Sequence, residues 1–337
     1  MSKNKSLGFQ FETSINNCFS KNFDKHSAKA AARADTANAE QKFPSWKVCS
    51  FSSKNRLVSC AYTFSKFLKE YYGDIKQVKD IKPIHCQEWI DHCAKSGCSI
   101  NTLDLYKSNL TKLSKIVNHN FGLHTDFTAT VKSDLVQDKT TAKEFALTPD
   151  EIEKIKASIT KPCNSSNYFL FTVHCATRVN SVEKICCRDL HFSKSNAFSV
   201  IIDIKNDKGS RDRTIEVQDK EFYKLCRSLV SGKNCNDLLF GGIKKESANR
   251  WLNRRMHKLN ITVPLDKSIG NKRILKSGFH SVRKASIREY YQKQYNHYIK
   301  QGFSETESKK LAEGDSCIRL GHSRDRKDVI SHYLRDI

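Results

Sequence analysis

The chain has 337 residues, enough for two domains, and carries a formal net charge of +23 at pH 7 with a pI near 9.5. So large a positive charge implies a polyanionic partner, and nucleic acid is the first candidate. A membrane surface is the competing polyanion, but no run of residues approaches the ~18 apolar positions of a membrane-spanning helix.

The N-terminal residues, Met1 to Leu7, lack the apolar stretch of a secretory signal peptide. We therefore expect the protein to stay in the cytoplasm. Its 13 cysteines fit that expectation, because their number is odd and no CxxC pair occurs. Most are expected to be small apolar core residues. The nearest approach to a metal-ligand cluster, between His85 and Cys98, lacks regular zinc-finger spacing, so we expect no metal.

Residues 1–45 are polar and basic, and they include an Ala/Lys run of high helix propensity, His26–Arg33. We expect a loosely ordered extension there, with Pro44 marking the break before the first packed domain.

Apolar spacing then predicts three helices. Residues three or four apart from Lys54 onward form the first, which Gly73 ends. The second runs from about Pro83 to Ala94, and Ser99 caps the third. Together they predict a small helical domain at residues 50–124.

The face of the third helix opposite its apolar stripe is basic, with Lys107, Lys112 and Lys115. Ordinary solvation would explain one such helix, and DNA binding is the alternative. Residues 125–145, rich in Thr, Lys and Asp, are predicted to be a linker.

A capping box opens the next domain, at residues 146–337. Thr148 is the predicted N-cap, Pro149 suits the first helical position, and Glu151 closes the box. Two strands are predicted further on, at Phe198–Ile204 and Arg213–Val217.

A helix with a dense basic face is predicted at Asn249–His257. Its arginines are interpreted as following phosphates; they are Arg250, Arg254 and Arg255.

Chemically reactive residues occur in a fixed order along this second domain. The order is Arg178, Lys208, His280-Ser-Val-Arg283, Leu320-Gly-His322 and Tyr333. Each motif alone is weak, since an HxxR is often two polar residues on a solvated helix. The ordered set resembles the tyrosine recombinase (phage integrase) family, over roughly residues 55–337.

The resemblance implies a mainly α fold with a small antiparallel β-sheet. The helical domain 50–124 would be the core-binding DNA domain, and residues 146–337 the α+β catalytic domain. In some members an N-terminal module binds arm sites on DNA, which is the alternative role for residues 1–45.

The resemblance also implies a function, that of a site-specific DNA recombinase, the integrase of a mobile genetic element. Such enzymes cut and rejoin double-stranded DNA attachment sites through a 3′-phosphotyrosyl intermediate, as tetramers on two duplexes. They need neither metal nor ATP, because arginines replace the metal ions of nucleases. An accessory DNA-bending protein is left open, and the expected location is the nucleoid.

Carried over to this sequence, the family's roles fall on six residues. Arg178 and Arg283 would hold the scissile phosphate with planar forks. His280 and His322 would donate to its oxygens and manage the phenol proton. Tyr333 would be the nucleophile.

Lys208 would be the general acid that protonates the leaving 5′-oxygen. It lies with Gly209 at the expected tip of the hairpin between the two predicted strands. A charged residue in a solvated turn is the competing interpretation, and Lys205 and Arg211 are the fallback candidates.

The sequence departs from the family pattern in two ways. Ser181 stands where an acidic residue often follows the first arginine, and the nearest carboxylate is Glu183. A long polar helical segment at residues 284–316 precedes the Leu-Gly-His box. Few residues follow Tyr333, so we expect subunit contacts to come from elsewhere, with residues 284–316 as the hypothesis.

Two other functions compete with recombination. A type IB DNA topoisomerase uses a similar set of residues, although those enzymes generally have lysine in place of His280. A catalytically silent DNA-binding protein of the same fold is the other alternative.

Overall fold

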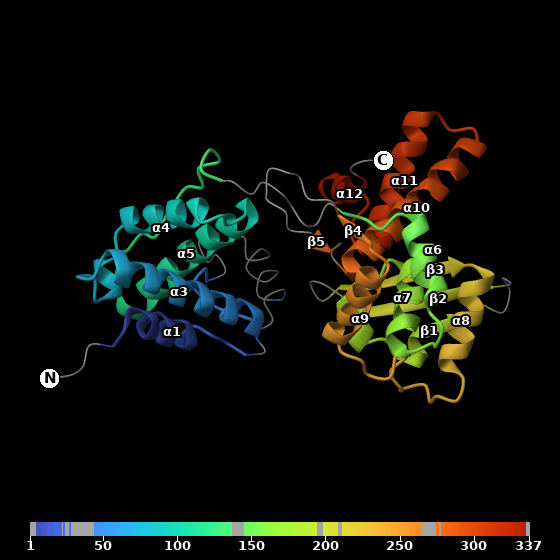
Figure 1. The fold of residues 1–337 in the computed structure, drawn as a ribbon, viewed down its shortest axis with the longest axis horizontal. Helices are drawn as coiled ribbons and strands as arrows, with labels where there is room; N and C mark the ends of the chain where they lie inside the picture. Colours follow the sequence, from blue (N-terminus) through green and yellow to red (C-terminus); the bar gives the residue numbers. More distant parts are fainter. Residues whose placement is uncertain are drawn as a thin grey trace, which may run out of the picture. The chain divides into compact units, whose positions relative to one another are not determined.

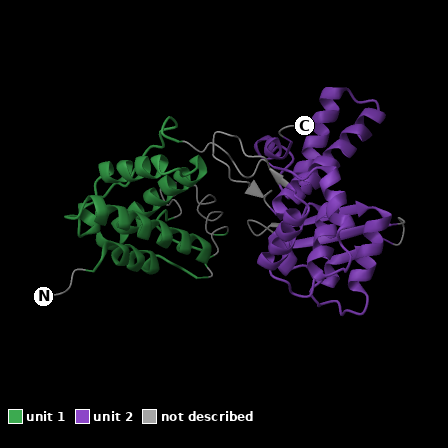
Figure 2. Cartoon of the chain, viewed as in Figure 1, with its two compact units in different colours: residues 1–141 green, residues 142–337 purple. Residues whose placement is uncertain are grey.

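The polypeptide divides into two units, residues 1–141 and residues 142–337, in the computed structural model of the chain (Figures 1 and 2). The residues that the structure describes are 5–21, 23, 27, 44–136, 145–193, 198–207, 211–263, 274–275 and 278–334. The division falls inside the predicted linker 125–145. Each unit has its own buried core.

Unit 1 is a helical bundle. Its elements are α1 (Leu7–Asn17), α3 (Phe51–Tyr71), the short 3-10 helix η2 (Val78–Asp80), α4 (Pro83–Lys95) and α5 (Ile100–Phe121). The three helices predicted from apolar spacing are confirmed as α3, α4 and α5. Phe64 and Trp89 are buried with their rings 4.9 Å apart, and they join α3 to α4.

The N-terminal segment differs from the loosely ordered extension that its polarity predicted. Leu7, Phe11 and Ile15 lie four residues apart on α1, and all three are buried in the core of unit 1. A short apolar stripe therefore fixes α1 against α3 and α5. The Ala/Lys run His26–Arg33 lies outside the described residues, apart from Ser27.

The first part of the predicted linker also packs on unit 1, where Phe127 is fully buried. The Asn118 amide donates to the Thr125 carbonyl at 2.8 Å, and its side-chain oxygen accepts from the Thr125 backbone N–H at 2.8 Å. The Asn118 side chain thus satisfies backbone hydrogen-bonding groups of an irregular segment. Its composition alone had predicted only a linker.

Unit 2 contains a three-stranded antiparallel sheet in the order β1 (Leu190–Phe192), β2 (Ser199–Asp207) and β3 (Arg211–Gln218). Both predicted strands are confirmed. Val200 pairs with Val217 and Ile202 with Ile215, and all four side chains are buried on the face that meets the helices.

Unit 2 also contains further helices and a pair of short strands, β4 and β5. They are α6 (Pro149–Ala157), α7 (Asn164–Cys175), η3 (Val179–Glu183), η4 (Cys187–Asp189), α8 (Lys220–Val230), α9 (Lys245–Lys258), β4 (Thr262–Val263), β5 (Ile274–Leu275), α10 (Phe279–Lys300), α11 (Glu305–Arg319) and α12 (Lys327–Leu334). The central helix, α7, contacts α8, α9, α10 and β3, and its Phe169 and Phe171 are fully buried.

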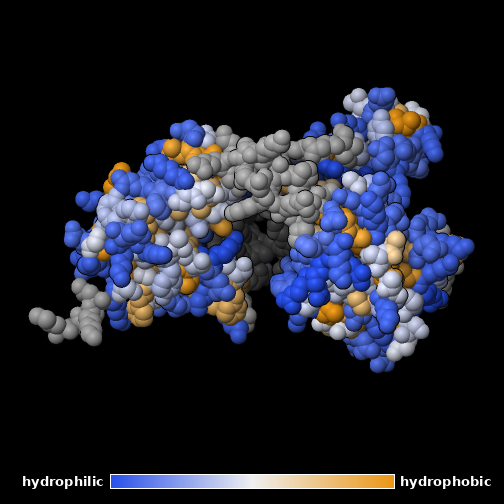
Figure 3. Space-filling view, in the orientation of Figure 1, coloured by the Kyte–Doolittle hydropathy of each residue, from blue (hydrophilic) through white to orange (hydrophobic). Residues whose placement is uncertain are grey.

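Helices α10 and α11 form a hairpin that projects from unit 2 (Figure 1). Ile299 and Phe303 beside its turn are 38% and 42% exposed, and an apolar patch is visible at the end of the hairpin in Figure 3. The hypothesis that residues 284–316 contact another subunit stays a prediction. Within the described residues, no helix combines the length and apolarity needed to cross a bilayer.

The capping box at the start of α6 yields a prediction about the stability of unit 2. The Thr148 hydroxyl accepts from the Glu151 backbone N–H at 3.2 Å, and the Glu151 carboxylate accepts from the Thr148 N–H at 2.8 Å. Thr148→Ala should lower the free energy of unfolding of unit 2 by about 1 kcal/mol, because one helix N–H loses its acceptor. Urea denaturation measures this. Ser247→Ala, an exposed change within α9, is the control and should leave the value within about 0.5 kcal/mol.

Candidate active site

A small apolar cluster lies beneath the predicted catalytic residues, separate from the main core of unit 2. It consists of Ala176, Ile287, Cys317, Leu320 and Ile330, from the end of α7, α10, the end of α11, and α12. Since each of these elements also carries or adjoins a predicted catalytic residue, packing of this cluster brings those residues together.

Arg283 is the most deeply buried charge of the site, with 1% of its surface exposed. Its Nη1 donates to the Ala176 carbonyl, its Nη2 donates to the Leu320 carbonyl at 3.0 Å, and its Nε donates to the Tyr333 hydroxyl at 3.2 Å. Two backbone carbonyls thus orient the guanidinium, while its third nitrogen faces the phenol. A buried charge with this many donors satisfied is held in one orientation.

The carbonyl of Ala176 is aimed at Arg283 by an unusual backbone conformation. Ala176 follows α7 with φ +50°, in the left-handed region, at a cost of roughly 1 kcal/mol for a residue with a Cβ. Its side chain is fully buried in the small cluster, so packing offsets that strain.

Arg178 lies two residues after Ala176 and directly before η3. Its Nη2 contacts the Leu320 carbonyl at 3.4 Å and His322 Nε2 at 3.3 Å. The buried Tyr168 hydroxyl donates to the Arg178 carbonyl, and burial raises the pKa of that phenol, so it stays a donor. Arg178 and Arg283 therefore converge on one carbonyl, the first from the segment between α7 and η3 and the second from α10.

The Leu-Gly-His box is the C-terminal cap of α11. Gly321 has φ +80°, its N–H donates to the Ile318 carbonyl at 2.8 Å, and the His322 N–H donates to the Cys317 carbonyl at 2.9 Å. This is a Schellman motif, in which the glycine reverses the chain after the helix. The reversal is what turns His322 back toward Arg178.

Tyr333 lies on α12 beside the first turn of α10. Its ring centroid is 5.9 Å from that of His280, and its own carbonyl accepts from Arg288 Nε at 2.8 Å. His280 and Arg283 are three residues apart on α10 and so share a face. The structure thus brings together Arg178, His280, Arg283, His322 and Tyr333.

Lys208 and Gly209 lie outside the described residues. The strands on either side pair as far as Asp207 with Arg211. Of the fallback candidates, Lys205 on β2 is exposed, and its Nζ lies 3.6 Å from Oδ1 of Asp189. The placement of the general acid therefore stays a prediction.

Two arginines that sequence reasoning did not select hold the His322 segment in place. Arg213, mostly buried on β3, donates to the Arg319 carbonyl, and its side chain lies against Gly321. Arg319 donates to the carbonyls of His174, at 2.6 Å, and Glu216, at 3.2 Å. The one sequence feature that could have indicated a role for Arg319 is its position directly before the Leu-Gly-His box.

Glu183, the carboxylate nearest to Arg178 in the sequence, serves another element. Glu183 Oε1 accepts from the Lys245 backbone N–H at 3.0 Å, at the start of α9, and Oε2 lies 3.5 Å from Lys244. The backbone hydrogen bond lowers the pKa of Glu183. Glu183 is thus a cap for α9, whereas Arg178 contacts the Leu320 carbonyl and His322.

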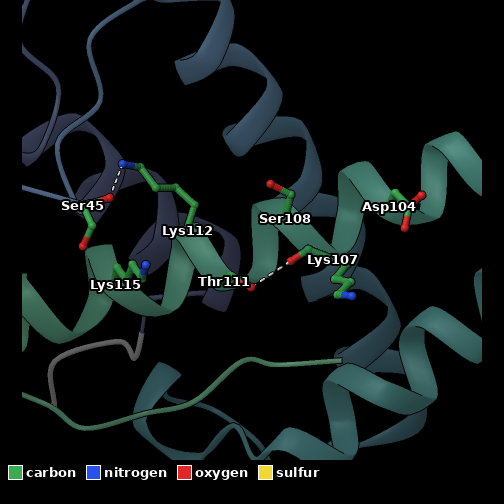
Figure 4. A pocket seen from close by; sticks show the side chains of 7 residues that line it. All are labelled: Ser45, Asp104, Lys107, Ser108, Thr111, Lys112 and Lys115. Atoms are coloured by element: carbon green, nitrogen blue, oxygen red, sulfur yellow. Dashed lines mark hydrogen bonds between the residues drawn. The ribbon is translucent and has the colours of Figure 1, made fainter. Parts of the chain in front are cut away.

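In unit 1 the predicted lysines of α5 surround a hollow of about 440 Å³ (Figure 4). Lys107 and Lys115 are exposed. Lys112 instead reaches across to the preceding segment, where its Nζ donates to the carbonyls of Ser45 and, at 2.9 Å, Lys47. The side chains of Asp104, Ser108 and Thr111 complete the lining, so it mixes cationic, neutral and acidic groups.

The three arginines predicted on α9 are not equivalent. Arg250 and Arg254 are exposed. Arg255 is half-buried, with its guanidinium 5.7 Å from the centroid of Trp251, and it donates to the Ser158 carbonyl at 2.9 Å. Arg255 therefore joins α9 to the end of α6.

The cysteines weighed as metal ligands lie in the helical core. Cys86 and Cys93 are buried, and burial raises the pKa of both thiols to about 12. A protonated thiol in an apolar core is a packing group. Among the described residues, no group of three or more His, Cys, Asp or Glu side chains is arranged to hold a metal ion.

No protein-family model matches the sequence, and no curated protein matches it either. Similarity is found among solved structures. XerH site-specific recombinase bound to its difH substrate aligns over 97% of this chain and 91% of its own, with a TM-score of 0.56 and 16% identity.

Two further structures align as broadly. A lambda integrase dimer bound to a COC′ core site covers 98% of this chain and 81% of its own, with a TM-score of 0.58 and 15% identity. The Tn1549 transposon integrase in complex with transposon right end DNA covers 99% and 96%, with a TM-score of 0.56 and 13% identity. The chain therefore has the tyrosine recombinase fold, and the predicted fold class is confirmed.

The geometry of the His322 turn yields a prediction. A Cβ on Gly321 would lie 2.9 Å from Arg213 Cδ, in addition to the strain of φ +80°. Gly232 is a matched control, because its φ is +72° and a Cβ there would meet nothing within 4 Å.

Gly232→Ala should therefore cost only the strain, about 1 kcal/mol of unfolding free energy. Gly321→Ala should cost about 1–3 kcal/mol more, because Arg213 must move. Urea denaturation of the two variants measures the difference. Equal costs would show that Arg213 does not confine Gly321.

Proposed function

We propose that this protein is a site-specific DNA recombinase, an integrase that cuts and rejoins DNA through a 3′-phosphotyrosyl intermediate. The observation that carries the proposal is the 3.2 Å contact from Arg283 Nε to the Tyr333 hydroxyl, in a cluster that also contains Arg178, His280 and His322.

That contact supports Tyr333 as the nucleophile. A guanidinium that donates to a phenol oxygen stabilises the developing phenolate, and it places the oxygen beside the group that would bind the phosphate. In-line attack on phosphorus expels the 5′-oxygen, and the phosphotyrosyl link conserves the bond for rejoining.

The remaining roles divide among the other five residues. Arg178 and Arg283 would neutralise the non-bridging oxygens, which carry the charge of the transition state. His280 and His322 would donate to the same oxygens or exchange the phenol proton. Lys208 is proposed as the acid for the leaving 5′-hydroxyl.

The rest of the chain would hold the duplex. Lys107 and Lys115 on α5, and Arg250 and Arg254 on α9, are exposed cations suited to phosphate contacts. Exchange of strands between two sites requires several active sites at once, so we propose a tetramer on two duplexes.

The first test is covalent trapping on a nicked suicide duplex with the native attachment sequence. Wild type should form a salt-resistant, protease-sensitive adduct, and Tyr333→Phe should form none, because the nucleophilic oxygen is gone. Arg283→Ala should slow adduct formation by on the order of 10²–10³ through loss of charge stabilisation. Denaturing gels measure all three.

Each other outcome has a clear meaning. An adduct with Tyr333→Phe would assign the nucleophile elsewhere. DNA binding without an adduct from wild type would favour the catalytically silent binder. An adduct with plasmid relaxation but no strand exchange would favour the topoisomerase.

A second test concerns the exposed lysines. Lys107→Ala and Lys115→Ala should each reduce the slope of log K against log salt by ~1, because each removes one phosphate contact. Lys69→Ala, an exposed lysine on α3, is the control and should leave the slope unchanged. Titration by fluorescence anisotropy at several salt concentrations measures the slopes.

A further inference from the structure

The segment that joins His322 to the Tyr333 helix is attached to the projecting hairpin. Arg324, in this loop, pairs through Nη2 with Oδ1 of Asp315 on α11. The other oxygen of the same carboxylate accepts from the Tyr298 hydroxyl of α10 at 2.5 Å. One carboxylate therefore ties together both helices of the hairpin and the loop.

A helix-interior glycine makes room for this arrangement. A Cβ on Gly314 would lie 2.6 Å from Arg324 Cγ and 2.8 Å from its Nε. Glycine costs about 1 kcal/mol relative to alanine inside a helix, so its presence in α11 calls for a reason. The Arg324 side chain, lying across the helix backbone at Gly314, supplies one.

Two further contacts hold the same loop. The Cys317 thiol donates to the Arg326 carbonyl at 3.4 Å, and Ile330 of α12 is buried against Ile287, Cys317 and Leu320. Asp315 is only 17% exposed, and its contact with Tyr298 raises the pKa of that phenol, which keeps the hydroxyl as donor. The loop is thus fixed at its middle by an ion pair and at its end by packing.

We propose that Asp315 is a positioning residue for Tyr333. With Arg324 and Tyr298 it forms a clasp that fixes residues 323–326 to the α10–α11 hairpin and so sets the place at which α12 presents the phenol to Arg283. The hairpin is then a support for the nucleophile within one chain, whatever else it contacts. This inference rests on the proposed role of Tyr333.

The test separates binding from cleavage. Asp315→Asn and Arg324→Ala should bind the attachment duplex with the affinity of wild type and form the covalent adduct at least tenfold more slowly. The double variant should be no slower than the slower single one, because both changes break one interaction. Arg324→Lys, which keeps the charge, should recover most of the rate.

Lys293→Ala is the matched control. Lys293 pairs with Glu289 at 2.7 Å on α10, where both side chains are more than half exposed, and its loss should leave the rate unchanged. Adduct rates equal to wild type in Asp315→Asn and Arg324→Ala would overturn the proposal. Additive effects in the double variant, or no recovery with Arg324→Lys, would also overturn it.

Hydrogen exchange distinguishes failure of the clasp from failure of the proposed function. Without DNA, amides of residues 323–334 should exchange at least tenfold faster in Asp315→Asn than in wild type. Unchanged exchange would overturn the clasp even if wild type forms an adduct. Faster exchange in a protein that forms no adduct would leave the clasp standing as a structural device and overturn its role in presenting a nucleophile.

Discussion

The structure of the candidate site depends on the burial of one charged group, the guanidinium of Arg283. Burying a cation is unfavourable unless its donors are satisfied, and here backbone carbonyls from two distant segments do so. Ala176 and Leu320 must therefore stay where they are, and both are anchored in the same apolar cluster. The left-handed residue after α7 and the glycine turn after α11 are the local means to that end.

This arrangement explains why the motifs are scattered along the sequence. Two of them contribute a backbone group as well as a side chain. The segment around Arg178 supplies the Ala176 carbonyl, and the Leu-Gly-His box supplies the Leu320 carbonyl, which receives both arginines. Loss of either carbonyl would leave the buried guanidinium of Arg283 with one acceptor fewer.

Much of the fold followed from sequence because local rules decided it. The capping box at Thr148, the apolar stripes of α3 to α5 and the two β-branched runs were confirmed in the structure. Helix α1 was missed, although Leu7, Phe11 and Ile15 have helical spacing, because its surroundings are polar and basic.

The site was predictable only in part. Order along the chain selected five residues that the structure places together, but their partners are mostly backbone carbonyls, which leave no mark on a sequence. Arg213 and Arg319 were overlooked for that reason. Likewise Glu183 was considered for Arg178 from spacing, while the structure uses it to cap α9.

The way these charges are held links folding to occupancy. Carbonyl oxygens carry only partial negative charge, so the carbonyl contacts described for Arg178 and Arg283 do not neutralise the two guanidinium groups. In the unfolded chain the same groups are separated and hydrated. Under the proposed function, a phosphodiester would contact both arginines only in the folded state, and its binding free energy would add to the stability of unit 2. Duplex DNA would then stabilise the folded state as well as serve as the substrate. The melting temperature of unit 2 should therefore rise as more of the protein has DNA bound at this site.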